Sequence, residues 1–160
     1  MFLSRKRRAE ATSKPSAEQM AGPPDEEVAA QMARLADAFV RGSAEEGHHF
    51  TYELQCVGRL DPLVELFLQS RPSPEVVGSM AMSLGAFVGE LIVRNGGGRW
   101  TYVPEVGAPG VQTGSRYVCF PLAKVGKRLT VGPEHSIAQF VDVSIFGDMP
   151  PEARRVGPTG

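Results

Sequence analysis

The feature that most constrains the fold is a long apolar helical segment that carries three glycines on one side. Ser-Pro at 73–74 is typical of a helix start, and Asn-Gly-Gly-Gly at 95–98 is typical of a helix end. Between them, Gly78, Gly85 and Gly89 are seven and four residues apart, which places them on one face. Each interior glycine costs a helix about 1 kcal/mol relative to alanine. We therefore expect another element to lie directly against this bare backbone, with a ligand in the same groove as the alternative.

The remaining pattern predicts a single α+β domain. It would consist of a small antiparallel sheet of about three strands packed on the central glycine-striped helix, with shorter helices around it. Alternation of apolar and polar residues predicts strands at Phe50–Leu54, Trp100–Val103 and Arg116–Phe120. Helical periodicity, with start and stop residues, predicts further helices at 25–41, 62–71, 121–129 and 133–146.

Three local expectations follow from the same reading. Asp61 stands before Pro62 and is predicted to be the N-cap of the helix that begins there. Trp100 is expected to pack over the end of the central helix. The Gly- and Pro-rich segment Glu105–Ser115 is predicted to be a turn or loop.

Charge and composition divide the chain into three parts. Residues 1–24 hold five basic and two acidic side chains with three prolines, which predicts a disordered basic tail. Residues 25–147 are predicted to form the domain, and 148–160 a flexible C-terminal tail. The chain beyond residue 24 carries 12 basic and 16 acidic residues, a balance that disfavours nucleic-acid binding.

Two cysteines and one apolar segment bear on the compartment. Cys56 and Cys119 belong to no CxxC motif and have no histidine at metal-ligand spacing, so we expect free thiols, no metal and no cofactor. No secretory signal is recognisable at the N-terminus, which favours the cytoplasm. Residues 76–89 are uncharged but shorter than the roughly 20 residues of a membrane span, so we expect no transmembrane segment.

Chemically active side chains are concentrated around the end of the central helix. Glu90 and Arg94 are spaced i, i+4, as are Lys124 and Arg128 in the later helix, and Trp100 follows the glycines. If the later helix packs across the end of the central helix, these five residues would form a site for an anionic ligand. The alternative is an ion pair from Glu90 to Arg94 or Arg128 that ties two elements together.

Three stretches together resemble a family of small, uncharacterised bacterial proteins. These stretches are FTYEL...VGRLDPLVELFL, LGAFVGELIVRNGGGRW and FPLAKVGKRLTVGPEHSIAQF, which cover about residues 50–146. The positions that match the family pattern are Asp61, Gly85, Gly89, Glu90, Gly98, Trp100, Pro121, Lys124, Val125 and Arg128. The chain departs from it in having proline after Asp61 and Val-Cys-Phe before Pro121. The resemblance implies a bacterial source and a shared fold, and implies no activity.

Three hypotheses about function remain at this point. The first is a non-enzymatic protein-binding or regulatory module in the cytoplasm, because the chain has no nucleophile–base pair, metal cluster or cofactor loop. The second is a small anionic ligand, bound or turned over at the five-residue cluster. The third is contact of residues 1–8 (MFLSRKRR) with an anionic membrane surface or an acidic partner.

Overall fold

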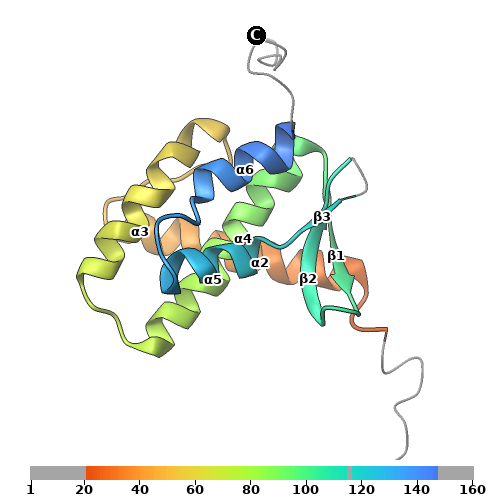
Figure 1. Ribbon diagram of the computed structural model, residues 1–160, viewed down its shortest axis with the longest axis horizontal. Coiled ribbons are helices and arrows are strands. Elements are labelled where there is room, and N and C mark those ends of the chain that lie inside the picture. The colour runs from red at the N-terminus through yellow and green to blue at the C-terminus, as the bar shows by residue number, and fades with distance from the viewer. Residues whose placement is uncertain (1–20, 115–116, 148–160) are drawn as a thin grey trace, which may run out of the picture.

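The computed structural model describes residues 21–114 and 117–147, which form helices around one central helix with a small sheet at one end (Figure 1). The predicted basic tail and C-terminal tail lie almost entirely outside this range. The α+β architecture is confirmed. The elements in chain order are α2 (Asp25–Glu45), η1 (Leu54–Arg59), α3 (Leu60–Gln69), α4 (Pro74–Gly96), β1 (Arg99–Val103), β2 (Ala108–Gln112), β3 (Val118–Cys119), α5 (Pro121–Thr130) and α6 (Ile137–Phe146).

Helix α4 is the centre of the domain, and its two halves differ in burial. The run from Leu84 to Ile92 is wholly buried between α2, α5 and α6, whereas the first two turns are mostly exposed. Ser73 caps the start of α4, and Gly97 ends it with a φ of 70° that glycine adopts without strain. The predicted bounds and central position of this helix are therefore confirmed.

Two of the three glycines in the stripe are in close contact with a neighbour. A Cβ at Gly85 would lie 2.8 Å from the Cα of Leu122 at the start of α5, and a Cβ at Gly89 would overlap the indole of Trp100. Gly78 is exposed and has nothing near it, so the expected close approach was wrong there. The reason is that α5 and the sheet cover only the C-terminal half of α4.

This difference gives a matched pair of substitutions. Gly78→Ala is expected to raise the free energy of unfolding by about 0.5–1 kcal/mol, because alanine favours the helix at an open position. Gly89→Ala is expected to lower it by about 1–3 kcal/mol, because the new methyl group displaces the indole. Urea unfolding followed by circular dichroism measures both. Changes of the same sign in the two variants would contradict the packing described.

The sheet has the order β1-β2-β3, with both pairs antiparallel. The strand predicted at Trp100–Val103 is confirmed, whereas the loop predicted at Glu105–Ser115 was wrong because it contains β2. Proline and glycine argued against a strand there. However, β3 pairs only with Val111 and Gln112, so Pro109 needs no hydrogen bond on that side.

The strand predicted at Arg116–Phe120 is confirmed in part, since β3 covers Val118–Cys119 and residues 115–116 lie outside the described range. Gly110 allows β3 to approach β2 closely, because a Cβ there would meet the side chain of Val118 at 2.5 Å.

The strand predicted at Phe50–Leu54 was wrong. Phe50 and Tyr52 do turn toward the core, and their rings contact Phe87 at centroid distances of 6.0 and 5.3 Å. Within the described residues, no strand pairs with this segment. Instead, the carbonyl of Tyr52 accepts a hydrogen bond from the Asn95 side chain, and that of His49 accepts one from Arg59. Alternation here reflects extended backbone packed on a helix, which the sequence alone does not distinguish from a sheet.

Several helix boundaries also differ from the prediction, and the helix predicted at 62–71 is α3 at Leu60–Gln69. Helix α2 continues past Gly42 to Glu45, because one glycine within a well-packed helix costs only about 1 kcal/mol. Helix α6 begins at Ile137 rather than at Pro133, with Ser136 as its N-cap. The hydroxyl of Ser136 accepts a hydrogen bond from the amide of Gln139, which defines that start.

Helix α4 is the one helix in the described part of the chain that is long and apolar enough to cross a bilayer. Helix α4 meets this criterion by length and composition only, and half of its most apolar window is buried within the domain. The apolar residues of the buried half belong to the core. In the exposed half, Val77, Met80 and Ala81 pack against the core, while Val76 and Met80 line one wall of the groove described below.

Candidate functional site

Glu90 is enclosed, with its side chain only 8% exposed, and both of its carboxylate oxygens are occupied. The Trp100 indole N–H donates to Oε1 at 2.9 Å, and the Arg94 Nε–H donates to Oε2 at 2.9 Å. The indole lies over Gly89, two turns before the end of α4, so the expectation that Trp100 packs over the helix end was wrong. Glu90, Arg94 and Trp100 are called the Glu90 cluster below.

The Glu90 cluster extends to α2 through Tyr52. The Arg94 guanidinium stacks on the Tyr52 ring with its Cζ 3.6 Å from the ring centroid. The Tyr52 hydroxyl donates to Asp37 of α2 at 2.6 Å. Burial and the hydrogen bond to Asp37 raise the pKa of Tyr52, so the phenol stays protonated. These contacts link α4, β1, the segment that holds Tyr52 and α2, and both carboxylate oxygens of Glu90 already accept a hydrogen bond within them.

Arg128 belongs to a separate cluster. Its side chain is 2% exposed, and it donates to Asp61 at 2.9 Å and to Glu65 at 2.6 Å. Asp61 was predicted to be the N-cap of α3 but lies inside that helix and instead caps α6. Its carboxylate accepts hydrogen bonds from the amides of Ile137 and Ala138 and from the Ser136 hydroxyl. These contacts join α3, α5 and α6 and are called the Asp61–Arg128 cluster.

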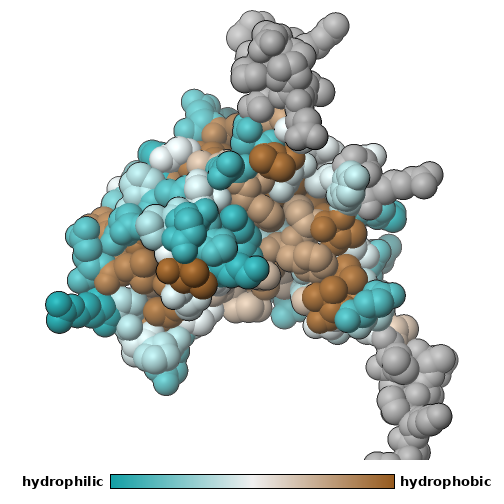
Figure 2. Space-filling model, viewed as in Figure 1, coloured by the Kyte–Doolittle hydropathy of each residue, from teal (hydrophilic) through white to brown (hydrophobic). Residues whose placement is uncertain are grey.

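Lys124 belongs to neither cluster. Its Nζ lies 5.9 Å from the ring centroid of Phe140 on α6, and the side chain is half-buried. Figure 2 shows hydrophilic side chains over α5 on the same face of the molecule. Of the five residues predicted to form one site, the structure brings Glu90, Arg94 and Trp100 together. It places Arg128 with Asp61 and Glu65, and Lys124 over Phe140.

The Asp61–Arg128 cluster predicts a pH dependence of stability. Burial alone would raise the pKa of Asp61, but the amides of Ala138 and Ile137, with Arg128 and Ser136, hold it below its ordinary value of 3.8. A depressed carboxyl pKa contributes stability above the ordinary pKa, which is lost as pH falls through the folded pKa. The free energy of unfolding is therefore expected to fall from about pH 5 downward, and less so in Asp61→Asn. Urea titrations from pH 7 to pH 2 measure this, with exposed Glu105→Gln as the control variant. An equally steep fall in Asp61→Asn and the native chain would contradict it.

A groove with a volume of about 800 Å³ lies between α2, α3 and α4. Helices α3 and α4 are consecutive but diverge from the loop that joins them (Figure 1), since α3 packs on η1 and α6 while α4 packs on α2 and α5. Each wall is one helix face with spacing i, i+3, i+4, i+7. These faces are Leu63, Leu66, Phe67 and Ser70 on α3, and Val76, Ser79, Met80 and Ser83 on α4.

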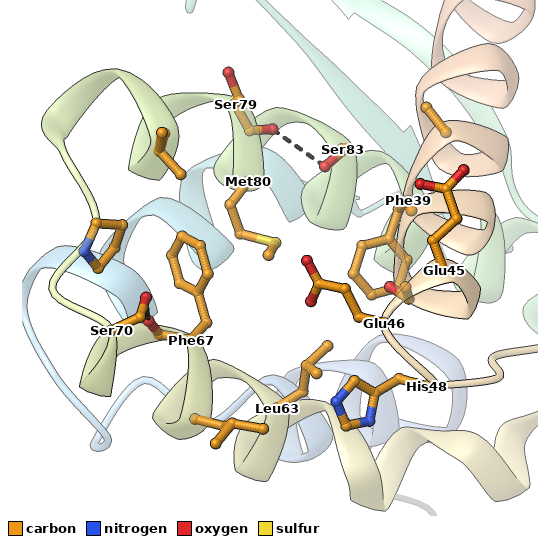
Figure 3. A pocket seen from close by; sticks show the side chains of 16 residues that line it. Phe39, Glu45, Glu46, His48, Leu63, Phe67, Ser70, Ser79, Met80 and Ser83 are labelled. Atoms are coloured by element: carbon orange, nitrogen blue, oxygen red, sulfur yellow. Dashed lines mark hydrogen bonds between the residues drawn. The ribbon is translucent and has the colours of Figure 1, made fainter.

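The groove is lined by apolar side chains interspersed with serines, and it is acidic at one end. Leu66 is 52% exposed on one wall and Val76 49% exposed on the other. Figure 3 shows the Glu46 carboxylate directed into the space between Phe67, Met80 and Phe39. Glu45 and Glu46, at the end of α2, have no ion-pair partner within the described residues. His48 lines the groove beside them, and no Lys or Arg does.

The sequence does not reveal the groove. Leu63, Leu66 and Phe67 form the apolar stripe of α3, but Leu63 and Phe67 pack against the core, as Met80 of α4 does, while Leu66 is 52% exposed. A stripe at helical spacing looks the same whether it meets a neighbour in its own chain or remains open. The detectable signal was the pair of acidic residues at the end of α2, where the helix dipole favours bases.

The described residues offer no grouping for metal binding and no activated thiol. Within residues 21–114 and 117–147, no three His, Cys, Asp or Glu side chains are placed to hold a metal ion. Cys56 and Cys119 are both free thiols, and burial raises the pKa of each, which disfavours the reactive thiolate.

No protein-family model, curated protein or solved structure matches this chain. The resemblance of residues 50–146 to small bacterial proteins therefore stays a prediction.

Proposed function

We propose that this protein is a non-enzymatic cytoplasmic module that binds a short amphipathic helix of a partner protein in the α2–α3–α4 groove. The observation that carries this proposal is the open groove itself, with large apolar side chains on both walls. Its volume of about 800 Å³ is roughly that of two turns of an α-helix about 10 Å wide. Helix-in-groove binding places the apolar face of a guest helix between two such walls.

The charge at the end of the groove defines the partner further. Glu45, Glu46 and the C-terminal carbonyls of α2 make that end negative, with no basic side chain in the last turn of α2 to neutralise it. A guest helix with lysine or arginine beside its apolar face would provide the missing positive charge. An acidic helix of the same shape would be repelled.

The alternative function, binding of a small anionic ligand by the five predicted residues, has less support. Glu90 uses both oxygens internally, and Arg128 binds Asp61 and Glu65 rather than standing beside Arg94.

The proposal is tested with two fluorescein-labelled model peptides of about 14 residues (roughly four turns). Both carry leucines at i, i+3, i+4 and i+7, one with lysines and the other with glutamates beside them. Fluorescence anisotropy is expected to show binding of the lysine peptide only. Leu66→Arg is expected to weaken binding at least about tenfold by filling the groove, as expected for a central anchor.

The matched control is Val143→Arg, because Val143 is 54% exposed on α6 and does not line the groove. This variant is expected to bind the lysine peptide as the native chain does. Equal weakening by the two arginine variants, or no binding of the lysine peptide at all, would contradict the proposed function.

A further inference from the structure

The chain itself contains a segment with the composition that the groove favours. Residues 2–8 (FLSRKRR) combine two large apolar side chains with four basic ones. These residues lie outside the described range. The C-terminal tail, 148–160, has two basic and two acidic residues and so lacks this excess of positive charge.

From these observations we infer that residues 2–8 bind in the α2–α3–α4 groove of their own chain and compete there with a partner helix. Phe2 and Leu3 provide apolar surface for the walls, and the basic residues at 5–8 provide charge for Glu45 and Glu46. The inference rests on the proposed function, because it assigns a second occupant to the same groove.

The connecting chain is long enough for this contact. Gly22 packs against Tyr102 of β1, three residues before α2 begins at Asp25. Helix α2 has 21 residues and is therefore about 32 Å long, and the groove lies at its far end. Residues 9–21 can span about 43 Å when extended. A tethered segment has an effective concentration of the order of mM, so modest affinity suffices for occupancy.

Competition has a measurable consequence for partner binding. If residues 2–8 occupy the groove, only the fraction of molecules with an empty groove can bind a partner. The apparent affinity for the partner is reduced by that fraction. Replacing the basic residues at 5–8 by glutamate is expected to strengthen binding of the lysine peptide about 3- to 10-fold. Replacing Phe2 and Leu3 by alanine is expected to act in the same direction.

The experiment uses the full chain labelled with ¹³C at the methionine methyl groups. Met80 lines the groove and reports its occupancy, whereas Met32 is buried in the core and Met82 lies outside the groove. Both tail variants are expected to shift the Met80 methyl signal and to leave those of Met32 and Met82 unchanged. Addition of the lysine peptide to either variant is expected to shift the Met80 signal again.

Three results would overturn the inference. One is an unchanged Met80 signal in both tail variants together with unchanged peptide affinity. Another is a Met80 shift that depends on protein concentration, which would place the segment in the groove of a second copy. The third is loss of binding to phosphatidylserine vesicles in the tail variants with no change at Met80, which would assign the segment to a membrane surface. In the first of these cases the lysine peptide binds all forms equally, so the proposed function stands and this inference alone fails.

Discussion

Asp61→Ala is expected to lower the free energy of unfolding by about 3–5 kcal/mol, because it leaves the guanidinium of Arg128 buried with only Glu65 to balance it. The same substitution removes part of the capping of α6, since the amides of Ile137 and Ala138 lose their acceptor while the Ser136 cap remains. Urea unfolding at pH 7 measures the loss. Asp61→Asn keeps the shape of the side chain and part of its hydrogen bonding. Its free energy of unfolding is expected to lie between those of Asp61→Ala and the native chain.

Replacing Asp61 is also expected to change peptide binding in the groove. The Asp61–Arg128 cluster fastens α3 to α5 and α6, and α3 does not pack closely against α4. Asp61 thereby keeps the α3 wall, with Leu63 and Phe67, apart from the α4 wall. In Asp61→Asn, which should remain folded at pH 7, weaker binding of the lysine peptide is expected. Native stability in Asp61→Ala would contradict the role assigned to this carboxylate.

Trp100→Ala is expected to lower the free energy of unfolding by a similar amount, about 3–5 kcal/mol. The indole is 3% exposed and fills the space above Gly89, so its removal leaves a cavity beside the central helix. It also leaves the Oε1 atom of the enclosed Glu90 without its donor. Thermal and urea unfolding followed by circular dichroism measure the loss.

Trp100→Phe separates the two contributions. It keeps most of the ring but removes the N–H, so the expected loss of about 1–3 kcal/mol reflects the unsatisfied carboxylate oxygen. Glu90→Gln can still accept from the indole and is expected to cost less than Trp100→Ala. If Trp100→Phe matched the native chain, the hydrogen bond to Glu90 would have no role in stability.

Local chemistry in the sequence predicted some helix ends correctly and others wrongly. Ser73 and Gly97 define the ends of α4, and the acidic first turn marks the start of α2, whereas α2 continues past Gly42 and α6 begins after Pro133. The spacing of Gly78, Gly85 and Gly89 indicated close packing, which Leu122 and Trp100 provide at Gly85 and Gly89 only. The i, i+4 pair of Glu90 and Arg94 forms as expected for neighbours on one helix.

Long-range pairing could not be predicted in this way. Asp61 has the local pattern of an N-cap, yet its partners lie 67 to 77 residues further along the chain. Pro109 and Gly110 argue against a strand, but β1 and β3 provide the pairing that makes one. Phe50 and Tyr52 alternate like a strand and have no neighbour to pair with. In each case the deciding contact comes from a residue remote in sequence.

The sequence by itself determined which segments form helices and the central place of α4, because helix formation depends on neighbours within about four residues. Only the tertiary structure decided which apolar stripes are covered. The faces of α3 and α4 have the spacing of core helices, but Asp61 and Arg128 hold α3 against α5 and α6, so Leu66 and Val76 remain exposed and the two faces form the groove.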